Sequence, residues 1–279
     1  MILPRVGQRY HQVAEHYDDL NHWYLEIWGE HVHHGLWETG SEDTETATLQ
    51  LTHKLIEAMN IKTGDSVVDI GCGYGGTARV LANGIGAKVT AFTLSKAQYD
   101  YAMEQSSGEG NPAFRLQNWF DNGLPSASQD AAISIESSEH MEDKPAFFKE
   151  VARVLKPGGR FGVYAWLAQP NPSPREIAWL LEPICREGRL PSMGNEAEYR
   201  EMMLAAGLVD ITYEDLSQKV KKTWPIIVGR MTNRLFTDPE ARRFLRYGPN
   251  REFARTVLRI WIAYNTGSMR YGLFTCRKP

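Results

Sequence analysis

The residues best suited to hold a small molecule gather in one stretch, where an acid, Asp69, is followed by a run of glycines from Gly71 to Gly76. Apolar residues surround the acid in SVVDI, and the helix-forming sequence TARVLA follows the glycines. This order predicts a buried strand, a tight turn, and a helix whose first N–H groups face the turn. Because glycine lets the backbone approach a ligand closely, the stretch predicts a cradle for a small molecule.

Asp69 distinguishes between the ligands that such a cradle holds. A dinucleotide site shows the spacing G-x-G-x-x-G, but in Gly71-Cys72-Gly73-Tyr74-Gly75-Gly76 the third glycine is out of place. A carboxylate at the end of the strand repels a pyrophosphate but suits a cationic amine. S-adenosylmethionine carries an ammonium and a sulfonium, so it is the predicted cofactor, with a nicotinamide dehydrogenase as the alternative.

Acid–base chemistry is predicted for a second stretch, IESSEHM. Glu136 is expected to end a strand and to border the reacting atoms, and Glu139 and His140 follow it. A carboxylate or imidazole there can remove a proton from an acceptor, and these three residues are the predicted catalytic residues. The alternative is structural, with Glu139 capping a helix or pairing with an arginine.

Aromatic residues and histidines are concentrated near the N-terminus. Aromatic faces attract cations, so Tyr17 and Trp28 are predicted to cover the sulfonium of the cofactor, although packing against a sheet explains them equally well. The sequence His-x-His-His is too compact for an ordinary zinc site, so no metal is expected. We expect His33 to hydrogen-bond the acceptor or the cofactor carboxylate.

Strands and helices are predicted to alternate after the glycine run. This alternation predicts a doubly wound, mostly parallel α/β sheet of seven strands, with ligands beyond the carboxyl ends of the strands. A turn is expected at 156–159. The predicted strands are 66–70, 88–94, 113–119, 130–137, 160–166, 209–216 and 270–278, and the predicted helices include 95–105, 144–155 and 196–206.

Composition narrows the class of protein. The net charge is −3 over 279 residues, which gives no indication of nucleic-acid binding. Three widely spaced cysteines favour a reducing compartment rather than a disulfide framework. No leader sequence is recognised, and no apolar run reaches the roughly 18 residues of a membrane span. A cytoplasmic location is therefore expected, with peripheral membrane association as an alternative.

The motifs together resemble a known family. VVDIGCGYGG and VARVLKPGGRF resemble class I S-adenosylmethionine-dependent methyltransferases, which have a Rossmann-like sheet. IWGEHVHHGLW, VTAFTLSKAQ, IESSEHM and the terminal YGLFTCRKP resemble the γ-tocopherol methyltransferase-like group. The resemblance extends from about Tyr17 to Pro279. It implies cofactor contacts from the glycine loop and from residues after the second and third strands: Asp69, Gly71, Cys72, Gly73, Gly75, Thr93, Leu94, Gln98, Asn118 and Trp119.

Two segments outside the common sheet, 169–193 and 219–264, are predicted to form the acceptor pocket because their aromatic residues suit a flat or apolar molecule. From Lys219 to Arg259 there are eleven Lys and Arg against three Asp and Glu. An amphipathic helix is expected around Arg251, Arg255 and Arg259. A solvated basic face, a membrane-docking surface and an anionic acceptor are the three interpretations of this charge.

The predicted protein is one structural domain. Residues 1–60 form an N-terminal helical lid, 61–168 the cofactor-binding core, and 169–279 the rest of the sheet with helical insertions. The predicted activity is methyl transfer to a small apolar or aromatic acceptor, with carbon methylation of a prenylated, terpenoid or phenolic compound favoured. The alternatives are N- or O-methylation of a specialised metabolite and a non-catalytic cofactor-binding protein. The sequence does not determine the oligomeric state.

Overall fold

A seven-stranded sheet forms the centre of the protein, which is described here from a computed structural model of residues 1–106 and 110–279. The strand order is β3-β2-β1-β4-β5-β7-β6, with β1 to β5 parallel and β7 antiparallel to both of its neighbours. This is the doubly wound, mostly parallel arrangement that the sequence predicts. The strands are β1 (Ser66–Ile70), β2 (Lys88–Thr93), β3 (Ala113–Leu116), β4 (Gln129–Ile135), β5 (Leu155–Ala168), β6 (Val209–Asp215) and β7 (Met269–Arg277).

Helices cover both faces of the sheet. One face is packed by α3 (Thr44–Ala58), by α4 (Gly76–Arg79) with its π-helical continuation Val80–Ile85, and by α5 (Lys96–Glu104). The other face is packed by α6 (Lys144–Val154) and α9 (Glu196–Ala205). Successive strand residues point to opposite faces, so Val67 belongs to the first core and Val68 to the second.

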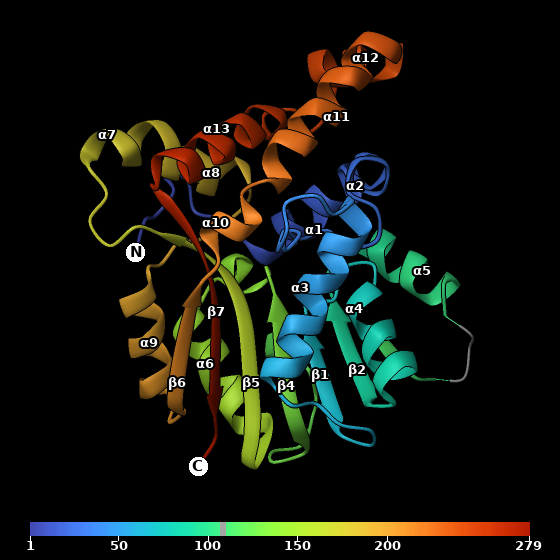
Figure 1. Cartoon of the computed structure of the whole chain (residues 1–279), viewed down its shortest axis with the longest axis vertical. Coiled ribbons are helices and arrows are strands. Elements are labelled where there is room, and N and C mark those ends of the chain that lie inside the picture. The colour runs from blue at the N-terminus through green and yellow to red at the C-terminus, as the bar shows by residue number, and fades with distance from the viewer. Residues whose placement is uncertain (107–109) are drawn as a thin grey trace.

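The remaining helices gather beyond the carboxyl ends of the parallel strands (Figure 1). We call them the cap. It consists of α1 (Tyr10–Asp19), α2 (Asn21–Ile27), α7 (Pro174–Glu176), α8 (Glu182–Glu187), α10 (Ser217–Val220), α11 (Thr223–Thr237), α12 (Pro239–Tyr247) and α13 (Phe253–Thr266). The π-helical segment Ile177–Leu181 joins α7 to α8. Within 1–60, α3 packs on the sheet, and only α1 and α2 lie over the strand ends.

Two predicted elements differ in detail. The third strand ends at Leu116, not at 119, because Asn118 turns the chain by accepting a hydrogen bond from the N–H of Phe120 into a 3-10 turn (Trp119–Asp121). The turn predicted at 156–159 lies within the bounds of β5. There the pairing with β4 jumps from Leu155 to Arg160, and Gly158 has a φ of +77°, so these residues form an irregularity in the strand.

No described helix has the length and apolar character needed to span a bilayer.

Candidate active site

A cavity of about 880 Å³ opens at the carboxyl ends of β1, β2 and β4. Most of the predicted cofactor residues line it, and residues from the cap close it. The lining includes Tyr17, His33, Asp69, Gly71, Gly73, Thr93, Leu94, Gln98, Asn118, Trp119, Glu136 and His140. The structure thus brings together residues from α1, the loop after α2 and four strand ends. We call this space the cofactor cavity.

Asp69 gives the cofactor cavity its electrostatic character. The residue is buried at the end of β1, and its Oδ2 has no hydrogen-bond partner among the described residues. Burial raises the pKa of Asp69 from 3.8 to about 7. A buried carboxylate without a donor is costly, so this atom favours a ligand that brings a cationic donor, as the ammonium of S-adenosylmethionine does.

Gly71 shapes the floor of the cavity. Its φ is +81°, and a Cβ at this position would collide with the side chain of Ser137. The hydroxyl of Ser137 hydrogen-bonds the carbonyl of Ile70, which holds the strand ends of β1 and β4 together. The cradle therefore requires glycine both for its backbone conformation and for its close contact with β4.

Three residues predicted to contact the cofactor do not line the cofactor cavity. Gly75 is the N-cap residue of α4 and packs against Phe114. Cys72 packs against the α3 side of the sheet, with its Sγ near the carbonyl of Gly73. Trp28 lies at the end of α2, where its ring packs near Tyr24, so it lines the neighbouring cavities described below. The predicted role of Trp28 as a cover over the sulfonium stays a prediction.

The residues after β2 are fixed by hydrogen bonds before any ligand binds. Thr93 Oγ1 donates to Gln98 Oε1 at 2.8 Å, and Ser95 Oγ accepts from the N–H of Gln98. Asp18 of α1 accepts from the hydroxyl of Ser95 and from the N–H of Ala97, which attaches the cap to the start of α5. This wall of the cofactor cavity is therefore preorganised.

A second cavity, of about 560 Å³, adjoins the cofactor cavity and shares Tyr17, His33, Glu136 and His140 with it. We call it the reaction chamber. Its other walls are mainly aromatic and include Tyr24, Trp28, Trp166, Trp224 and Phe253. Glu139 and His34 also line it. All three predicted catalytic residues therefore border one chamber next to the predicted cofactor.

Glu136 is held in the wall of the chamber by four hydrogen bonds. Its carboxylate accepts from the N–H and Nδ1–H of His34, from the indole N–H of Trp166, and from the hydroxyl of Tyr271, at distances of 2.7 to 2.9 Å. Burial by itself raises the pKa of Glu136, but the contacts with His34 outweigh it and bring the pKa to about 2. Glu136 is thus an ionised group that holds the loop after α2 against β5 and β7, and its four donors leave it little capacity to take a further proton.

His140 has the geometry of a base. Its Nδ1 lies 3.1 Å from the carbonyl oxygen of Arg189, so Nδ1 carries the proton and donates to that oxygen. Its Nε2 therefore accepts from the hydroxyl of Tyr17, which lies 3.1 Å away. Burial lowers the pKa of His140 to about 4, so the ring is neutral near pH 7. Tyr17 faces both the cofactor cavity and the chamber, and the Tyr17–His140 pair joins the two.

Glu139 lies in a different environment. Its Oε1 accepts from the backbone N–H of Trp166, and burial raises the pKa of its carboxyl. The nearby Lys144 is also buried, and its ammonium donates to the carbonyl of Glu139 and to both oxygens of Ser192. This lysine ties the turn Ser138–His140 to the loop before α9, so the turn that carries Glu139 and His140 is rigid.

The histidines form a chain along the loop after α2. His31 Nδ1 lies 3.2 Å from His33 Nε2, and His33 Nδ1 lies 2.8 Å from the carbonyl oxygen of His34. Both ring nitrogens of His33 are therefore occupied within the protein. Its predicted hydrogen bond to the acceptor or cofactor stays a prediction. In the described residues no group of three or more His, Cys, Asp or Glu is arranged to hold a metal ion.

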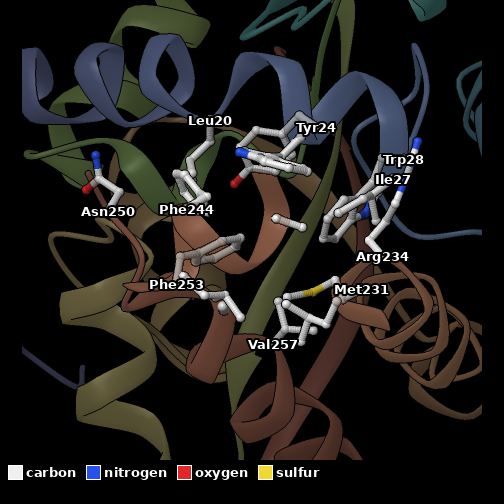
Figure 2. Close-up of a pocket in the computed structure, with 15 residues that line it drawn as sticks. Leu20, Tyr24, Ile27, Trp28, Met231, Arg234, Phe244, Asn250, Phe253 and Val257 are labelled. Atoms are coloured by element: carbon white, nitrogen blue, oxygen red, sulfur yellow. The ribbon is translucent and has the colours of Figure 1, made fainter. Parts of the chain in front are cut away.

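A third cavity, of about 580 Å³, lies in the cap next to the reaction chamber. We call it the apolar tunnel. It shares Tyr24, Trp28 and Phe253 with the chamber, and Figure 2 shows these side chains turned toward a common space with Met231 and Val257. Its walls come from α2, α11, α12 and α13. Sequence reasoning assigned segment 219–264 to the acceptor pocket but did not reveal that α2 supplies the facing wall.

The predicted basic segment is partly neutralised inside the protein. Lys219 pairs with Glu38, Arg234 with Glu26, and Arg259 with Glu187. The predicted amphipathic helix forms as α13, but its faces differ from the expectation. Arg259 turns inward to its ion pair, and Leu258 is exposed.

Comparison with known proteins identifies the family. The family described as mycolic acid cyclopropane synthetase matches residues 5–236. The chain belongs to this family. Its members are S-adenosylmethionine-dependent methyltransferases, so the predicted enzyme class and cofactor are confirmed. The orphaned carboxylate of Asp69 and the glycine floor fit this cofactor.

Similarity to known proteins, in sequence or in fold, extends over nearly the whole chain. A probable chloroplastic tocopherol O-methyltransferase from Oryza sativa subsp. japonica is 30% identical, over 96% of this chain and 78% of the relative. The crystal structure of the [4+2]-cyclase SpnF has a TM-score of 0.83 at 25% identity, covering 100% of this chain and 99% of that one. Mycolic acid cyclopropane synthase CmaA1, complexed with SAH and CTAB, has a TM-score of 0.85 at 18% identity, covering 98% and 99%.

Proposed function

We propose that this methyltransferase acts on an acceptor with a polar, phenolic head and a long apolar tail of prenyl or terpenoid type. The observation that carries the proposal is the series of adjoining spaces: cofactor cavity, reaction chamber and apolar tunnel. Polar groups line much of the first two spaces, whereas the tunnel walls are almost entirely apolar, with Arg234 and Asn250 among the few polar lining residues. A head group in the chamber places a tail of the same molecule in the tunnel.

The walls of the chamber favour carbon as the methylated atom. When bound, S-adenosylmethionine supplies an electrophilic methyl group. An arene or alkene carbon that accepts it develops positive charge, whereas a phenolate oxygen becomes neutral. Aromatic rings of Trp166, Trp224 and Phe253 and the ionised Glu136 surround the chamber, and such groups stabilise a cation.

The Tyr17–His140 pair provides a route for the proton that a phenol must lose. The acceptor hydroxyl donates to the oxygen of Tyr17, and Tyr17 donates its own proton to Nε2 of His140. His140 then holds the proton, with its Nδ1–H still bonded to the carbonyl of Arg189. Methylation of a ring carbon places positive charge on the phenol, and the hydroxyl proton leaves along this route as that charge develops. The hydrogen on the methylated carbon then leaves as a proton to solvent, the oxygen regains its proton from His140 through Tyr17, and the aromatic phenol is restored.

The experiment uses purified protein, methyl-labelled S-adenosylmethionine, and pairs of phenols that differ only in the presence of a prenyl tail. We expect a label on ring carbon by mass spectrometry and a much lower KM for the tailed member of each pair. Transfer to oxygen or nitrogen would favour the second candidate, N- or O-methylation, and the name of the rice relative supports its O-methylation part. Equal KM values for both members would refute a role of the tunnel in binding the tail.

A further inference from the structure

One end of the cap combines exposed apolar residues with arginines. Phe236 at the end of α11 is 82% exposed, and Tyr247 at the end of α12 is 68% exposed. On α13, Arg255, Leu258 and Ile262 follow at spacings of three and four residues, which places them along one side of the helix. All three are exposed. Figure 1 shows α11, α12 and α13 together at the end of the molecule farthest from the C-terminus.

The exposed arginines of this end have no acidic partners among the described residues. In the described ranges 1–106 and 110–279, the exposed arginines of α12, α13 and the loop between them take part in no ion pair; they are Arg242, Arg243, Arg246, Arg251 and Arg255. Two exposed glutamates, Glu240 and Glu252, lie on the same stretch and offset part of this charge. The net charge of the surface is positive.

A groove of about 960 Å³ opens between α11 and α13 at this surface. Its lining residues include Arg251, Arg255 and Leu258, together with Glu252. The groove shares Met231 and Ala254 with the apolar tunnel, so the two spaces are separated only by side chains that line both. The sequence of spaces from the predicted cofactor therefore ends at the arginine-rich surface.

We propose that this surface docks on an anionic lipid surface, from which the acceptor enters the groove tail first. The residues of the docking surface are Phe236, Tyr247, Arg251, Arg255, Leu258 and Ile262. Arginines without acidic partners match anionic head groups, and exposed aromatic and aliphatic side chains suit the boundary between head groups and acyl chains. An acidic protein would match the arginines but would not explain a groove that leads to an apolar tunnel. The route for the acceptor rests on the proposed function, whereas the docking itself does not.

The test measures flotation of the full chain with vesicles in the absence of acceptor and cofactor. Vesicles of phosphatidylcholine alone are compared with vesicles that contain phosphatidylglycerol. Because each basic residue near an anionic membrane contributes about 1 kcal/mol, about a fivefold effect, the double variant Arg251→Gln/Arg255→Gln should bind anionic vesicles about 30-fold more weakly. The variant Leu258→Ser/Ile262→Ser should weaken binding to both kinds of vesicle.

The matched control is Lys62→Gln/Lys88→Gln. Both lysines are exposed and lie near the amino ends of β1 and β2, at the opposite end of the sheet. This variant loses the same charge, so it should bind vesicles as the unaltered protein does. If the control and the arginine variant lose vesicle binding equally, the binding depends only on the net charge of the protein, and the proposal is overturned. Unaltered protein that does not float with anionic vesicles would also overturn it.

Failure of the docking and failure of the proposed function are distinguishable. Methyl transfer to a tailed phenol dispersed in neutral detergent requires no lipid surface, so it tests the proposed function alone. Transfer in detergent without flotation would reject only the docking surface. Flotation without transfer would reject the acceptor class and leave the docking surface supported.

Discussion

Substitution of Asp69 by asparagine should have opposite effects on stability and on cofactor affinity. The carboxyl is 2% exposed and its Oδ2 has no partner in the described residues, so ionisation in the ligand-free protein is unfavourable. Its pKa is about 7 in the folded state, against 3.8 for an aspartate that is fully exposed to water. Each pH unit corresponds to about 1.4 kcal/mol, so ionising this group costs at most about 4 kcal/mol of folding free energy.

The sign of the effect follows from proton binding. Between about pH 4 and pH 7 the folded state binds the proton on Asp69 more tightly than the unfolded state, so stability falls as the pH rises through this range. Asparagine has no charge to bury. Without ligand, Asp69→Asn should therefore have a higher free energy of unfolding than the unaltered protein at pH 8, by up to about 4 kcal/mol, and a similar one at pH 4.

Affinity should change in the other direction. A hydrogen bond to a charged group contributes about 1.5 to 3 kcal/mol, so loss of the carboxylate should weaken S-adenosylhomocysteine binding about 10- to 100-fold. Urea unfolding at pH 4 and pH 8 measures the first effect, and calorimetric titration at pH 8 the second. Asp69→Asn protein that is less stable at pH 8, or that binds S-adenosylhomocysteine as tightly as before, would refute the reasoning.

Asp130→Asn provides the control at the other end of the sheet. Partial burial raises the pKa of Asp130, but the hydrogen bonds from Lys156 and Ser66 and the charges of Lys156 and Arg160 together outweigh it, and the net shift is downward. Its carboxylate therefore stabilises the fold when ionised. This variant should lose stability at pH 8 and keep its affinity for S-adenosylhomocysteine.

Three further predictions concern the chamber and the tunnel. His140→Gln should lower kcat about 100-fold or more with little change in cofactor affinity. Because the pKa of His140 is about 4, kcat in the unaltered protein should fall only below about pH 5. A kcat unchanged by the substitution would reject the proton route. Ala254→Trp should fill the tunnel and exclude about three methylenes of the acceptor tail. The lost binding free energy is about 2.4 kcal/mol, so KM for a tailed acceptor should rise about 50-fold. The untailed acceptor is the control, and its KM should not change. Glu136→Gln places an amide against several hydrogen-bond donors and should lower the free energy of unfolding by about 3 kcal/mol. Urea denaturation measures this change. A free energy of unfolding equal to that of the unaltered protein would show that the hydrogen bonds of Glu136 are dispensable.

The sheet could be predicted because its signals are local. Apolar runs, glycine turns and caps lie next to the elements that they define, and the residue after each strand was placed at the carboxyl edge by topology alone. Asp69 illustrates this, since its place follows from its position at the end of β1. The end of β3 was placed too late because the side chain of Asn118 caps a turn there, and an apolar run does not reveal such a cap.

The roles of the catalytic candidates could not be predicted because they depend on distant partners. Glu136 and Glu139 are three residues apart and chemically identical, yet one is ionised by contacts with His34 and the other is held in a buried position beside Trp166. Trp28 lies at the C-terminal end of α2 with its ring near Tyr24, and this packing places it at the chamber and the tunnel rather than at the cofactor cavity. No pattern within a single segment contains that information.

The hydrogen bonds of Glu136 have a consequence for biosynthesis. Its partners lie on the loop that carries His34, on β5, and on β7, where Tyr271 comes 135 residues after Glu136 along the chain. The ribosome synthesises Glu136 long before Tyr271. The carboxylate therefore lacks one of its hydrogen-bond donors while the earlier strands of the core are already synthesised. The walls of the chamber also include Trp224 and Phe253, so the chamber too is complete only late in synthesis.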